Sequence, residues 1–326
     1  MTRELMVFRH GKAAARSSVA IGDDLSRPLA DKGKRGAQRM GVWLWQKDIR
    51  PDYILCSPAE RAITSAHKLC KAMGADPSLI NNENRLHTAD VKTLLSILSD
   101  CPKKHKRIML VGHNPGLADL LSYLLGAQTP EPEDGKLLPT ASLARLLLPE
   151  NWKKLEYGCA RLKVLTRPDD LPTWFPFPAP NGKEKRDRPA YYYHQSAVIP
   201  YRIRNNKLEV MLIGSSKRNH LVVPKGIHEP GLSAQESAAC EAYEEAGIRG
   251  EVSKSMIGSY DYEKWGSTCT VEVYAMQVNE QLPQNEWQES HRGRKWMSTV
   301  EAAGLVKEPS LRPMIKSLEA IINRIS

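Results

Sequence analysis

The chain has 326 residues, 41% of them hydrophobic and 26% charged, a composition typical of globular proteins and not of disordered or fibrous ones. This length exceeds what one hydrophobic core usually holds, so we expect two domains. No stretch reaches the roughly 18–20 uninterrupted apolar residues of a membrane span, and Met1–Glu4 does not begin a secretory signal peptide. The six cysteines form no Cys-x-x-Cys pair, which argues against a disulfide framework and a structural zinc site. We therefore expect a cytoplasmic protein without a membrane partner.

The net charge of +10 is concentrated in the first half of the chain. Residues 1–165 hold 26 lysines and arginines against 17 acidic residues, a net +9, whereas residues 191–326 are balanced. A basic field of this kind attracts polyanions, although a solvated basic surface would give the same count. Charge alone does not choose between these two interpretations.

Before residue 166, short apolar runs alternate with helix-like segments. Strands are predicted at Leu5–Phe8, Tyr53–Cys56, Ile108–Val111, Ser142–Leu148 and Cys159–Leu165, and helices at Lys32–Trp45, Pro58–Met73, Val91–Leu98 and Gly116–Leu125. A repeated alternation of strand and helix predicts an α/β sandwich with a mainly parallel sheet. In such sheets ligands bind beyond the carboxyl ends of the strands.

Residues 166–190 contain six prolines, a density that excludes a helix or a central strand. We interpret the segment as a semi-rigid linker that Trp174, Phe175 and Phe177 could pin onto a domain. The predicted domains are therefore residues 1–165 and 191–326, joined by the linker 166–190.

After the linker the pattern changes to a strand-rich mixture, which predicts a mixed α/β sandwich. The predicted elements are strands at Ser196–Arg202 and Leu208–Gly214, joined by an Asn205-Asn206 turn, a helix at Ala234–Ala246, strands near Glu251–Tyr260 and Cys269–Val278, and a final helix at Leu311–Ile325.

In the first half, arginines and histidines follow three successive predicted strands. Arg9-His10-Gly11 follows the first strand, Arg61 lies in the first turn of the helix after the second, and His113 follows the third. Each histidine alone is better explained as a turn or core residue, but the joint arrangement favours a site. Residues 3–165 resemble the histidine phosphatase superfamily, and within it the SixA-type phosphohistidine phosphatases. The resemblance implies a histidine-phosphatase-like α/β sandwich.

By this resemblance His10 is the nucleophile, and Arg9, Arg61 and His113 form the phosphate pocket. The chemistry agrees, because a neutral imidazole can attack phosphorus to form a phosphohistidine. Two guanidiniums and a second imidazole can stabilise the charge on the equatorial oxygens. These steps need no metal, so we expect no cofactor in this domain.

Larger relatives of these phosphatases carry a carboxylic acid that protonates the leaving group. Glu83 and Asp90 are candidates here, but neither lies in the motif of the larger enzymes. A substrate with a good leaving group, such as phosphohistidine or a phosphoanhydride, would need no such acid. The general acid is therefore Glu83, Asp90 or neither.

In the second half, Glu241, Glu244 and Glu245 stand at i, i+3 and i+4 of one predicted helix. This spacing places all three on one face. Ser233 with Glu236 predicts a capping box at the start of the helix. A solvated acidic patch would give the same pattern, whereas the functional interpretation is a site for a hard divalent cation.

The segment resembles the Nudix box, G-x5-E-x7-R-E-U-x-E-E-x-G-U with U a bulky apolar residue, and the resemblance covers residues 191–326. It implies a Nudix α/β/α sandwich in which Mg²⁺ or Mn²⁺ is held by the three glutamates and the carbonyl of Gly226. Three positions depart from the pattern, with Leu232, Cys240 and Ala242 in place of the first Glu, the Arg and the bulky apolar residue. The metal face itself is intact, so we favour an active site over a degenerate one.

Within the superfamily, the chain is similar to the diphosphoinositol polyphosphate and diadenosine polyphosphate hydrolases. This similarity implies that Lys217, Arg218 and Lys225 face a phosphate chain, although loop lysines and arginines are usually only solvated. Glu286 or Glu289 could add a metal ligand. Stacking of a base would fall to Tyr191–Tyr193 or Trp265.

We therefore predict a two-domain phosphohydrolase. The Nudix domain would cleave a phosphoanhydride in a dinucleoside polyphosphate, a nucleotide or an inositol pyrophosphate, and the phosphatase domain would remove a phosphoryl group from the product or a related compound. One alternative is a protein phosphohistidine phosphatase with a regulatory Nudix module, and another is a non-enzymatic sensor of polyphosphorylated ligands. The expected partner is a phosphorylated small molecule or a phosphohistidine protein, not nucleic acid. The leaving group, the order of action and the oligomeric state stay open.

Overall fold

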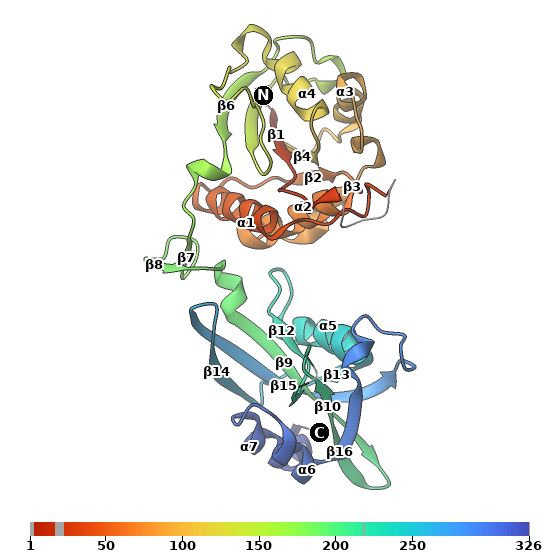
Figure 1. The fold of residues 1–326 in the computed structure, drawn as a ribbon. Helices are drawn as coiled ribbons and strands as arrows, with labels where there is room; N and C mark the ends of the chain where they lie inside the picture. The colour runs from red at the N-terminus through yellow and green to blue at the C-terminus, as the bar shows by residue number, and fades with distance from the viewer. Residues whose placement is uncertain (1–2, 17–22, 218, 326) are drawn as a thin grey trace. The chain divides into compact units, whose positions relative to one another are not determined.

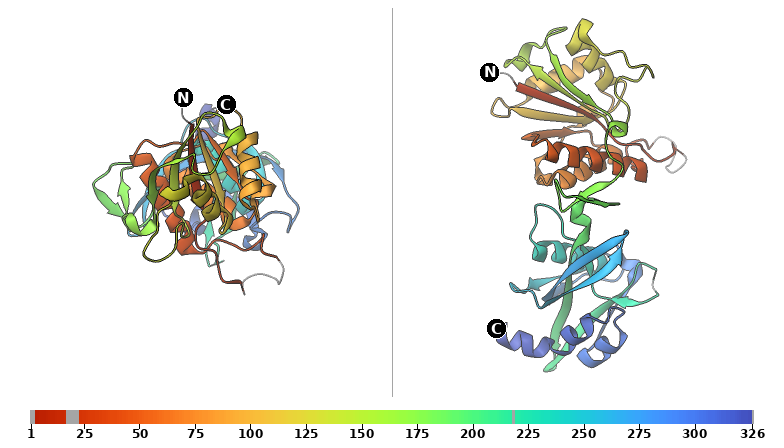
Figure 2. Two further views of the ribbon diagram at one scale, coloured as in Figure 1. Left: turned by 90° about the horizontal axis from the view of Figure 1, so that it is seen from above. Right: turned by 90° about the vertical axis from the view of Figure 1, so that its left-hand side faces the viewer.

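The computed structural model describes residues 3–16, 23–217 and 219–325, and it divides into two compact units, Met1–Lys185 and Arg186–Ser326 (Figures 1 and 2). In each unit a β-sheet lies between helices, so the predicted α/β fold class is confirmed. None of the helices in these described ranges is long and apolar enough to cross a membrane.

The N-terminal unit is built on a six-stranded sheet with the order β3-β2-β4-β1-β5-β6. Its strands are β1 (Arg3–Arg9), β2 (Tyr53–Cys56), β3 (Ile80–Asn82), β4 (Arg107–Gly112), β5 (Leu143–Leu148) and β6 (Arg161–Thr166). The strands β1 to β4 pair in parallel, and β5 and β6 join in antiparallel fashion. The sheet is thus mainly parallel, as predicted. The prediction missed β3 because this strand has only three residues and two of them are asparagines.

Two pairs of helices cover the faces of this sheet (Figure 1). They are α1 (Asp31–Gln46) and α2 (Glu60–Met73) on one face, and α3 (Val91–Asp100) and α4 (Gly116–Leu125) on the other. The side chains of β1 alternate between the two cores, since Met6 and Phe8 pack with α1 and α2 while Leu5 and Val7 pack with α3 and α4. All four are fully buried. A strand buried on both faces in this way reads as a continuous apolar run.

The proline-rich segment after β6 packs against α1. Arg39 of α1 donates hydrogen bonds to the carbonyl oxygens of Pro168, Leu171 and Pro172. Phe175 is 1% exposed and begins the short strand β7 (Phe175–Phe177), which pairs with β8 (Glu184–Arg186). The first part of the predicted linker is therefore held by the N-terminal unit.

The C-terminal unit is built on an eight-stranded sheet. Its strands are β9 (His194–Arg204), β10 (Lys207–Gly214), β11 (Leu221–Val222), β12 (Lys225–Ile227), β13 (Ile248–Val252), β14 (Gly258–Lys264), β15 (Ser267–Gln281) and β16 (Arg294–Ser298). The central strands β9 and β15 are parallel, and β9 turns into β10 at Asn205 and Asn206, whose φ angles are 52° and 59°. Two positive φ angles match the predicted tight hairpin turn.

Helix α5 (Ala234–Ala246) covers one face of this sheet, and α6 (Thr299–Leu305), α7 (Leu311–Lys316) and α8 (Leu318–Ile325) cover the other. This arrangement is the predicted α/β/α sandwich. The predicted single helix over residues 311–325 is two helices that meet at Ser317, whose hydroxyl donates to the Pro313 carbonyl. The predicted strand near residues 251–260 is also two strands, separated by a turn in which the Ser253 hydroxyl donates to the Ser255 carbonyl.

Candidate active sites

In the N-terminal unit, three parallel strands end at one edge of the sheet. Arg9 of β1 stands beside Gly112 of β4, and Val111 of β4 stands beside Cys56 of β2. The His10 backbone N–H continues the ladder by donating to the Gly112 carbonyl at 3.1 Å. The residues that follow these strands therefore converge at the carboxyl edge, where α/β sheets bind ligands.

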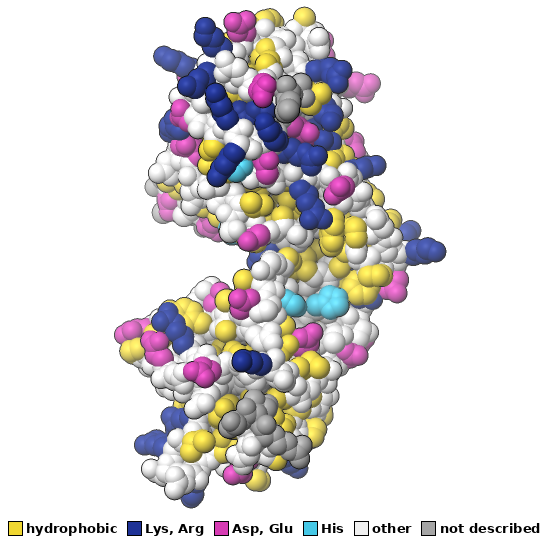
Figure 3. Space-filling model, turned by 180° about the vertical axis from the view of Figure 1, so that it is seen from behind, with side chains coloured by type: hydrophobic (Ala, Val, Ile, Leu, Met, Phe, Trp, Pro, Cys, Tyr) yellow, Lys and Arg dark blue, Asp and Glu magenta, His cyan; other side chains and the backbone are white. Residues whose placement is uncertain are grey.

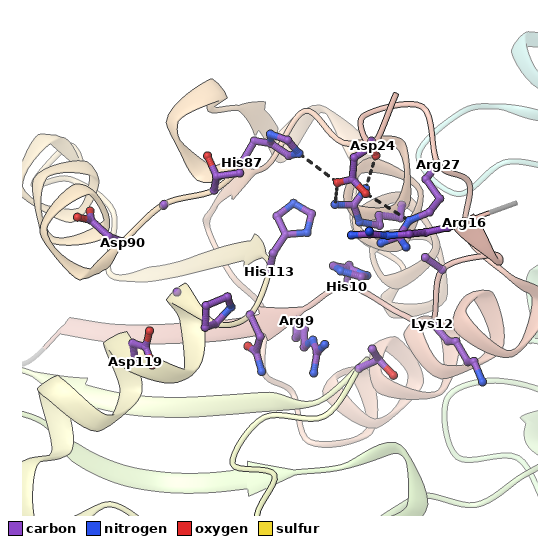
Figure 4. A pocket seen from close by; sticks show the side chains of 18 residues that line it. Arg9, His10, Lys12, Arg16, Asp24, Arg27, His87, Asp90, His113 and Asp119 are labelled. Atoms are coloured by element: carbon purple, nitrogen blue, oxygen red, sulfur yellow. Dashed lines mark hydrogen bonds and ion pairs between the residues drawn. The ribbon is translucent and has the colours of Figure 1, made fainter. Parts of the chain in front are cut away.

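A cavity of about 580 Å³ opens at this edge (Figure 4). Four candidate residues line it: Arg9, His10, Arg61 and His113. Arg9 and His10 lie at the end of β1, Arg61 lies at the start of α2, and His113 follows β4. The rings of His10 and His113 lie 4.8 Å apart between centroids. The structure thus brings together the four residues that the sequence singled out.

The hydrogen bonds of His10 define which nitrogen can react. Its Nδ1 lies 2.6 Å from the Gly11 carbonyl oxygen, and because a carbonyl only accepts, Nδ1 must carry the hydrogen. The other nitrogen, Nε2, then keeps its lone pair. Burial lowers the pKa of His10 to about 4, and the nearby positive charges of Arg61 and Arg9 act in the same direction. The ring is therefore neutral at physiological pH, as a nucleophile must be.

Nitrogen atoms without partners surround His10. The Nε atoms of Arg9 and Arg61 and the Nδ1 of His113 are buried and make no hydrogen bond within the described ranges. The opposite nitrogen of His113 lies 2.7 Å from the Ser57 hydroxyl oxygen, which fixes the ring. A buried polar group without a partner is costly, so these three atoms indicate a place for a ligand with several oxygens, such as a phosphoryl group.

The cavity also holds residues that the sequence argument did not single out as site residues. They are Lys12, Arg16, Asp24, Arg27, His87 and Asp119. Asp24 binds Arg61 most closely, with 2.6 Å between Oδ2 and Nη2, and its carboxylate lies 3.4 Å from the His87 Nε2. No short motif could have found these contacts, because Asp24 precedes Arg61 by 37 residues and lies outside any predicted element.

The two candidate acids lie in different places, and both carboxylates have hydrogen-bond partners. Glu83 pairs with Arg85, at 2.8 Å between Oε2 and Nη2, and does not line the cavity. Asp90 lines the cavity, but its carboxylate caps α3 by accepting from the Thr93 N–H at 2.8 Å. Hydrogen bonds from Arg85 and from Thr93 hold the pKa of Glu83 and of Asp90 below the ordinary values. A general acid needs the opposite shift.

The loop that carries His10 rests directly on the start of α1. A Cβ atom at Gly11 would lie 2.4 Å from the carbonyl oxygen of Gly33, and one at Gly33 would lie 2.3 Å from that of Lys12. Both approaches are too close for any side chain, so the two glycines allow the backbones to touch.

In the C-terminal unit, the predicted glutamates lie on α5. The helix begins at the predicted capping box of Ser233 and Glu236 and ends at Gly247, whose φ is 60°. Glu245 is buried, Glu241 is half-buried and Glu244 is exposed. The three carboxylates therefore share one side of the helix but differ in their access to solvent.

Two donors hold the buried Glu245 carboxylate. Arg292 donates from Nη2 to Oε1 at 2.7 Å, and the backbone N–H of Lys225 donates to Oε2 at 3.1 Å. Burial raises the pKa of Glu245 to about 7, while the positive charge of Arg292 acts in the opposite direction. Arg292 lies in a 3₁₀ turn (Ser290–Arg292) and was not singled out from the sequence.

Glu241 lies against the backbone of Gly226 in β12. A Cβ atom at Gly226 would lie 1.8 Å from the Glu241 Oε1, so a larger residue there would displace the Glu241 carboxylate. Burial raises the pKa of Glu241 to about 8, helped by the charges of Glu245 and Glu244. Several carboxylates close to one another and to a backbone carbonyl group match the oxygen ligands that a hard divalent cation prefers. In the described ranges, no three His, Cys, Asp or Glu side chains are already arranged to hold a metal ion.

Two of the three departures from the Nudix pattern lie at the surface, whereas Ala242 is fully buried. Leu232 is 40% exposed, and Cys240 is also exposed. An ion pair at these two positions would therefore lie in solvent and contribute little. The guanidinium that contacts a box glutamate comes instead from Arg292, 47 residues after Glu245.

Beside Glu245 lies a second cavity, of about 380 Å³, to which Lys225, Lys264 and Arg292 contribute positive charge. Lys225 donates from Nζ to the Tyr262 hydroxyl at 2.9 Å, and burial lowers its pKa to about 8. Lys217 is exposed and does not line this cavity, nor a third cavity that Gly214 and Arg294 line. Arg218 lies outside the described residues.

The other residues noted in the sequence take different places. The Glu289 carboxylate pairs with Arg292, and Glu286 is exposed. The Tyr192 and Trp265 rings meet edge to face at 5.2 Å between centroids, and neither ring lines the second cavity.

Comparisons with known proteins match the two halves of the chain to two different families. The family model of the histidine phosphatase superfamily (branch 1) matches residues 5–91, and that of the NUDIX domain matches residues 193–318. Nudix hydrolase 12, mitochondrial, of Arabidopsis thaliana is 32% identical over an alignment of 152 residues, and the match covers 39% of this chain and 74% of that protein. An uncharacterized protein of Mycobacterium tuberculosis is 33% identical over 160 residues, which are 48% of this chain and 96% of that protein.

Solved structures resemble each unit. The protein histidine phosphatase SixA complexed with tungstate is 20% identical and covers 51% of this chain and 98% of its own, with a TM-score of 0.43. The Ap4A hydrolase of C. elegans is 22% identical and covers 40% of this chain and 98% of its own, with a TM-score of 0.35.

Proposed function

Because the chain belongs to the Nudix hydrolases and its N-terminal unit matches the histidine phosphatase superfamily, we propose that it is a two-domain phosphohydrolase. The C-terminal unit would cleave a phosphoanhydride in a polyphosphorylated compound. The N-terminal unit would remove a phosphoryl group from the product or from a related compound. The observation that carries this proposal is the convergence of buried nitrogen atoms without partners around a neutral His10.

In the phosphatase unit, Nε2 of His10 attacks the phosphorus atom as the bond to the leaving oxygen breaks. The electron pair of that bond goes to the leaving group, and a phosphohistidine forms. Arg9, Arg61 and His113 bind the equatorial oxygens, where the transition state holds its charge. A water molecule then attacks the phosphorus, the P–N bond breaks, and His10 returns to its neutral form as phosphate leaves.

In the Nudix unit, the residues that would hold Mg²⁺ or Mn²⁺ are Glu241, Glu244 and Glu245 with the carbonyl of Gly226. A bound divalent cation supplies charge neutralisation for a phosphate chain and lowers the pKa of a water molecule. Arg292 orients the Glu245 carboxylate, and Lys225 presents an ammonium group to the adjacent cavity. The exposed Lys217, and Arg218 next to it in the sequence, would meet the outer phosphates.

A screen of phosphate release tests the proposal. Purified full-length protein is given nucleotides, dinucleoside polyphosphates, inositol pyrophosphates, polyphosphate and a phosphohistidine peptide, each with Mg²⁺ or with EDTA. We expect one activity that requires Mg²⁺ and a second that persists in EDTA. Tight binding of polyphosphorylated ligands without turnover in either condition would replace the hydrolase by a sensor.

We also propose a phosphorylated small molecule as the partner and the cytoplasm as the location. The small-molecule partner is supported by the size of the two cavities, which lies in the range of about 300–1,000 Å³ typical of ligand pockets. Fractionation of cells that express the tagged protein tests the location.

A further inference from the structure

The phosphatase cavity carries more positive charge than one phosphoryl group requires. Lysine and arginine side chains gather on the face of the N-terminal unit drawn in Figure 3. Lys12, Arg16 and Arg27 line the cavity in addition to the two arginines of the phosphate pocket. In Figure 4 these three side chains lie on one side of His10, and Asp90 lies on the other.

The three additional cations have few partners. The side chains of Lys12 and Arg16 make no hydrogen bond or ion pair with any described residue. Arg27 faces Asp24 at 3.5 Å, but its buried Nε makes no hydrogen bond in the described ranges. The Asp24 carboxylate is bound more closely by Arg61, at 2.6 Å. Arg27 therefore shares its carboxylate with Arg61, and Lys12 and Arg16 pair with no described carboxylate, which leaves positive charge for a ligand to offset.

The position of these cations relative to His10 indicates what they bind. A phosphoryl group attacked by Nε2 is held by Arg9, Arg61 and His113, so a second group of cations lies beside the reacting group. A phosphohistidine side chain would bring one phosphoryl group and a neutral imidazole, with no charge for Lys12 or Arg27 to bind. A terminal diphosphate would place its second phosphoryl group among them.

We propose that Lys12, Arg16 and Arg27 form a leaving-phosphate subsite, and that the phosphatase unit acts on a terminal phosphoanhydride of a small molecule such as a nucleoside diphosphate. This inference rests on the proposed phosphohistidine chemistry of His10. Nε2 bonds to the terminal phosphorus, and the bond from that phosphorus to the bridging oxygen breaks. The bridging oxygen keeps the electron pair and leaves as part of the remaining phosphate.

The subsite also explains why this cavity works without a carboxylic acid from Glu83 or Asp90. A phosphate leaves as an anion and needs no proton, whereas an alkoxide must be protonated as it leaves. Cations beside the bridging oxygen stabilise the negative charge that develops there. A phosphate ester has no second phosphoryl group for these cations to bind.

Steady-state kinetics in EDTA tests the subsite in the full chain, with ADP, AMP and p-nitrophenyl phosphate as probes. We expect wild type to prefer ADP over AMP by at least about a hundredfold. Arg27→Gln and Lys12→Gln should each lower kcat/KM for ADP by about tenfold, the effect of one charged hydrogen bond. Their kcat/KM for p-nitrophenyl phosphate, which has one phosphoryl group and a good leaving group, should fall by a clearly smaller factor than for ADP.

Arg50→Gln is the control of equal charge, because Arg50 belongs to the same unit but does not line the cavity. Lys12 is exposed, so its variant should keep the wild-type melting temperature. Equal losses for ADP and p-nitrophenyl phosphate would overturn the subsite, as would faster turnover of a phosphohistidine peptide than of ADP. His10→Ala tests the phosphohistidine chemistry separately from the subsite. If this variant still hydrolyses p-nitrophenyl phosphate, the phosphohistidine chemistry is refuted. If the variant loses this turnover but wild type shows no preference for ADP, only the subsite is refuted.

Discussion

The phosphatase cavity and the acidic face of α5 have opposite charges, although we assign phosphoryl chemistry to both. Around His10, the buried Nε atoms of Arg9 and Arg61 lack partners, and burial together with these cations keeps the histidine neutral. On α5, burial and neighbouring carboxylates raise the pKa of Glu241 to about 8. The first site provides positive charge from its own side chains. The second provides negative charge, which an external cation must offset before a polyphosphate can approach.

The comparison predicts that a mutation can abolish the activity of one site and leave the activity of the other unchanged. His10→Ala should lower the metal-independent activity at least about a thousandfold, because the covalent nucleophile is lost. Turnover that depends on Mg²⁺ should stay within about twofold of wild type. An acid-labile ³²P label on wild type, missing from the variant, is the expected signature, and equal labelling of both proteins would exclude His10 as the nucleophile.

Two glutamate variants sharpen the comparison within the acidic site. Glu241→Gln and Glu245→Gln should each lower the Mg²⁺-dependent activity about a hundredfold or more, since each removes a proposed cation ligand. Their melting temperatures in EDTA should differ in sign. Glu241→Gln relieves repulsion and should raise it, whereas Glu245→Gln breaks the buried pair with Arg292 and should lower it by several degrees. Shifts in the same direction would contradict the pairing seen in the structure.

The opposite charges also predict opposite responses to pH. The pKa of Glu241 is raised above its unfolded value, so in EDTA its contribution to stability is lost as pH rises from about 4.5 through 8. The pKa of His10 is lowered to about 4, so its contribution is lost as pH falls from about 6.5 through 4. Thermal unfolding of the full chain across this range, with Glu241→Gln as the comparison for the alkaline side, checks both signs. Mg²⁺ should flatten only the alkaline response.

The smallest effect is expected at the start of α5. Glu236→Gln keeps a side chain that can accept the Ser233 N–H, so it should cost at most about 1 kcal/mol of stability. Neither activity should change by more than about twofold. A large loss of Mg²⁺-dependent turnover would mean that the acidic site depends on charge well beyond the three box glutamates.

Residues that follow strands or share a helix face could be predicted from the sequence, because their placement depends on local geometry. His10, His113 and the glutamates of α5 belong to this class. Asp24 and Arg292 do not, since each reaches its partner through the tertiary fold, over 37 residues to Arg61 and 47 residues to Glu245. The same limit applies to Glu83. Arg85 binds both the Glu83 and the Asp100 carboxylates, and no local sequence pattern predicts that this pairing holds the Glu83 carboxylate outside the cavity.

The sequence also left open what the exchange of box residues means. Leu232 and Cys240 replace two charged residues of the box pattern, and both side chains are exposed. Helix periodicity places a residue on a face, yet it does not say whether that face is covered. Only the tertiary fold shows that Arg292, which lies outside the box, contacts Glu245.

The backbone contact between Gly11 and Gly33 restricts both positions to glycine for the same physical reason. An added Cβ at either position would collide with main-chain atoms, which no change in a neighbouring side chain can remove. Compensation at the partner position is also closed, because that position already carries the smallest residue. In a mutational library selected for phosphatase turnover, both glycines should therefore persist without covarying, and their invariance would report on chain crossing and not on contact with substrate.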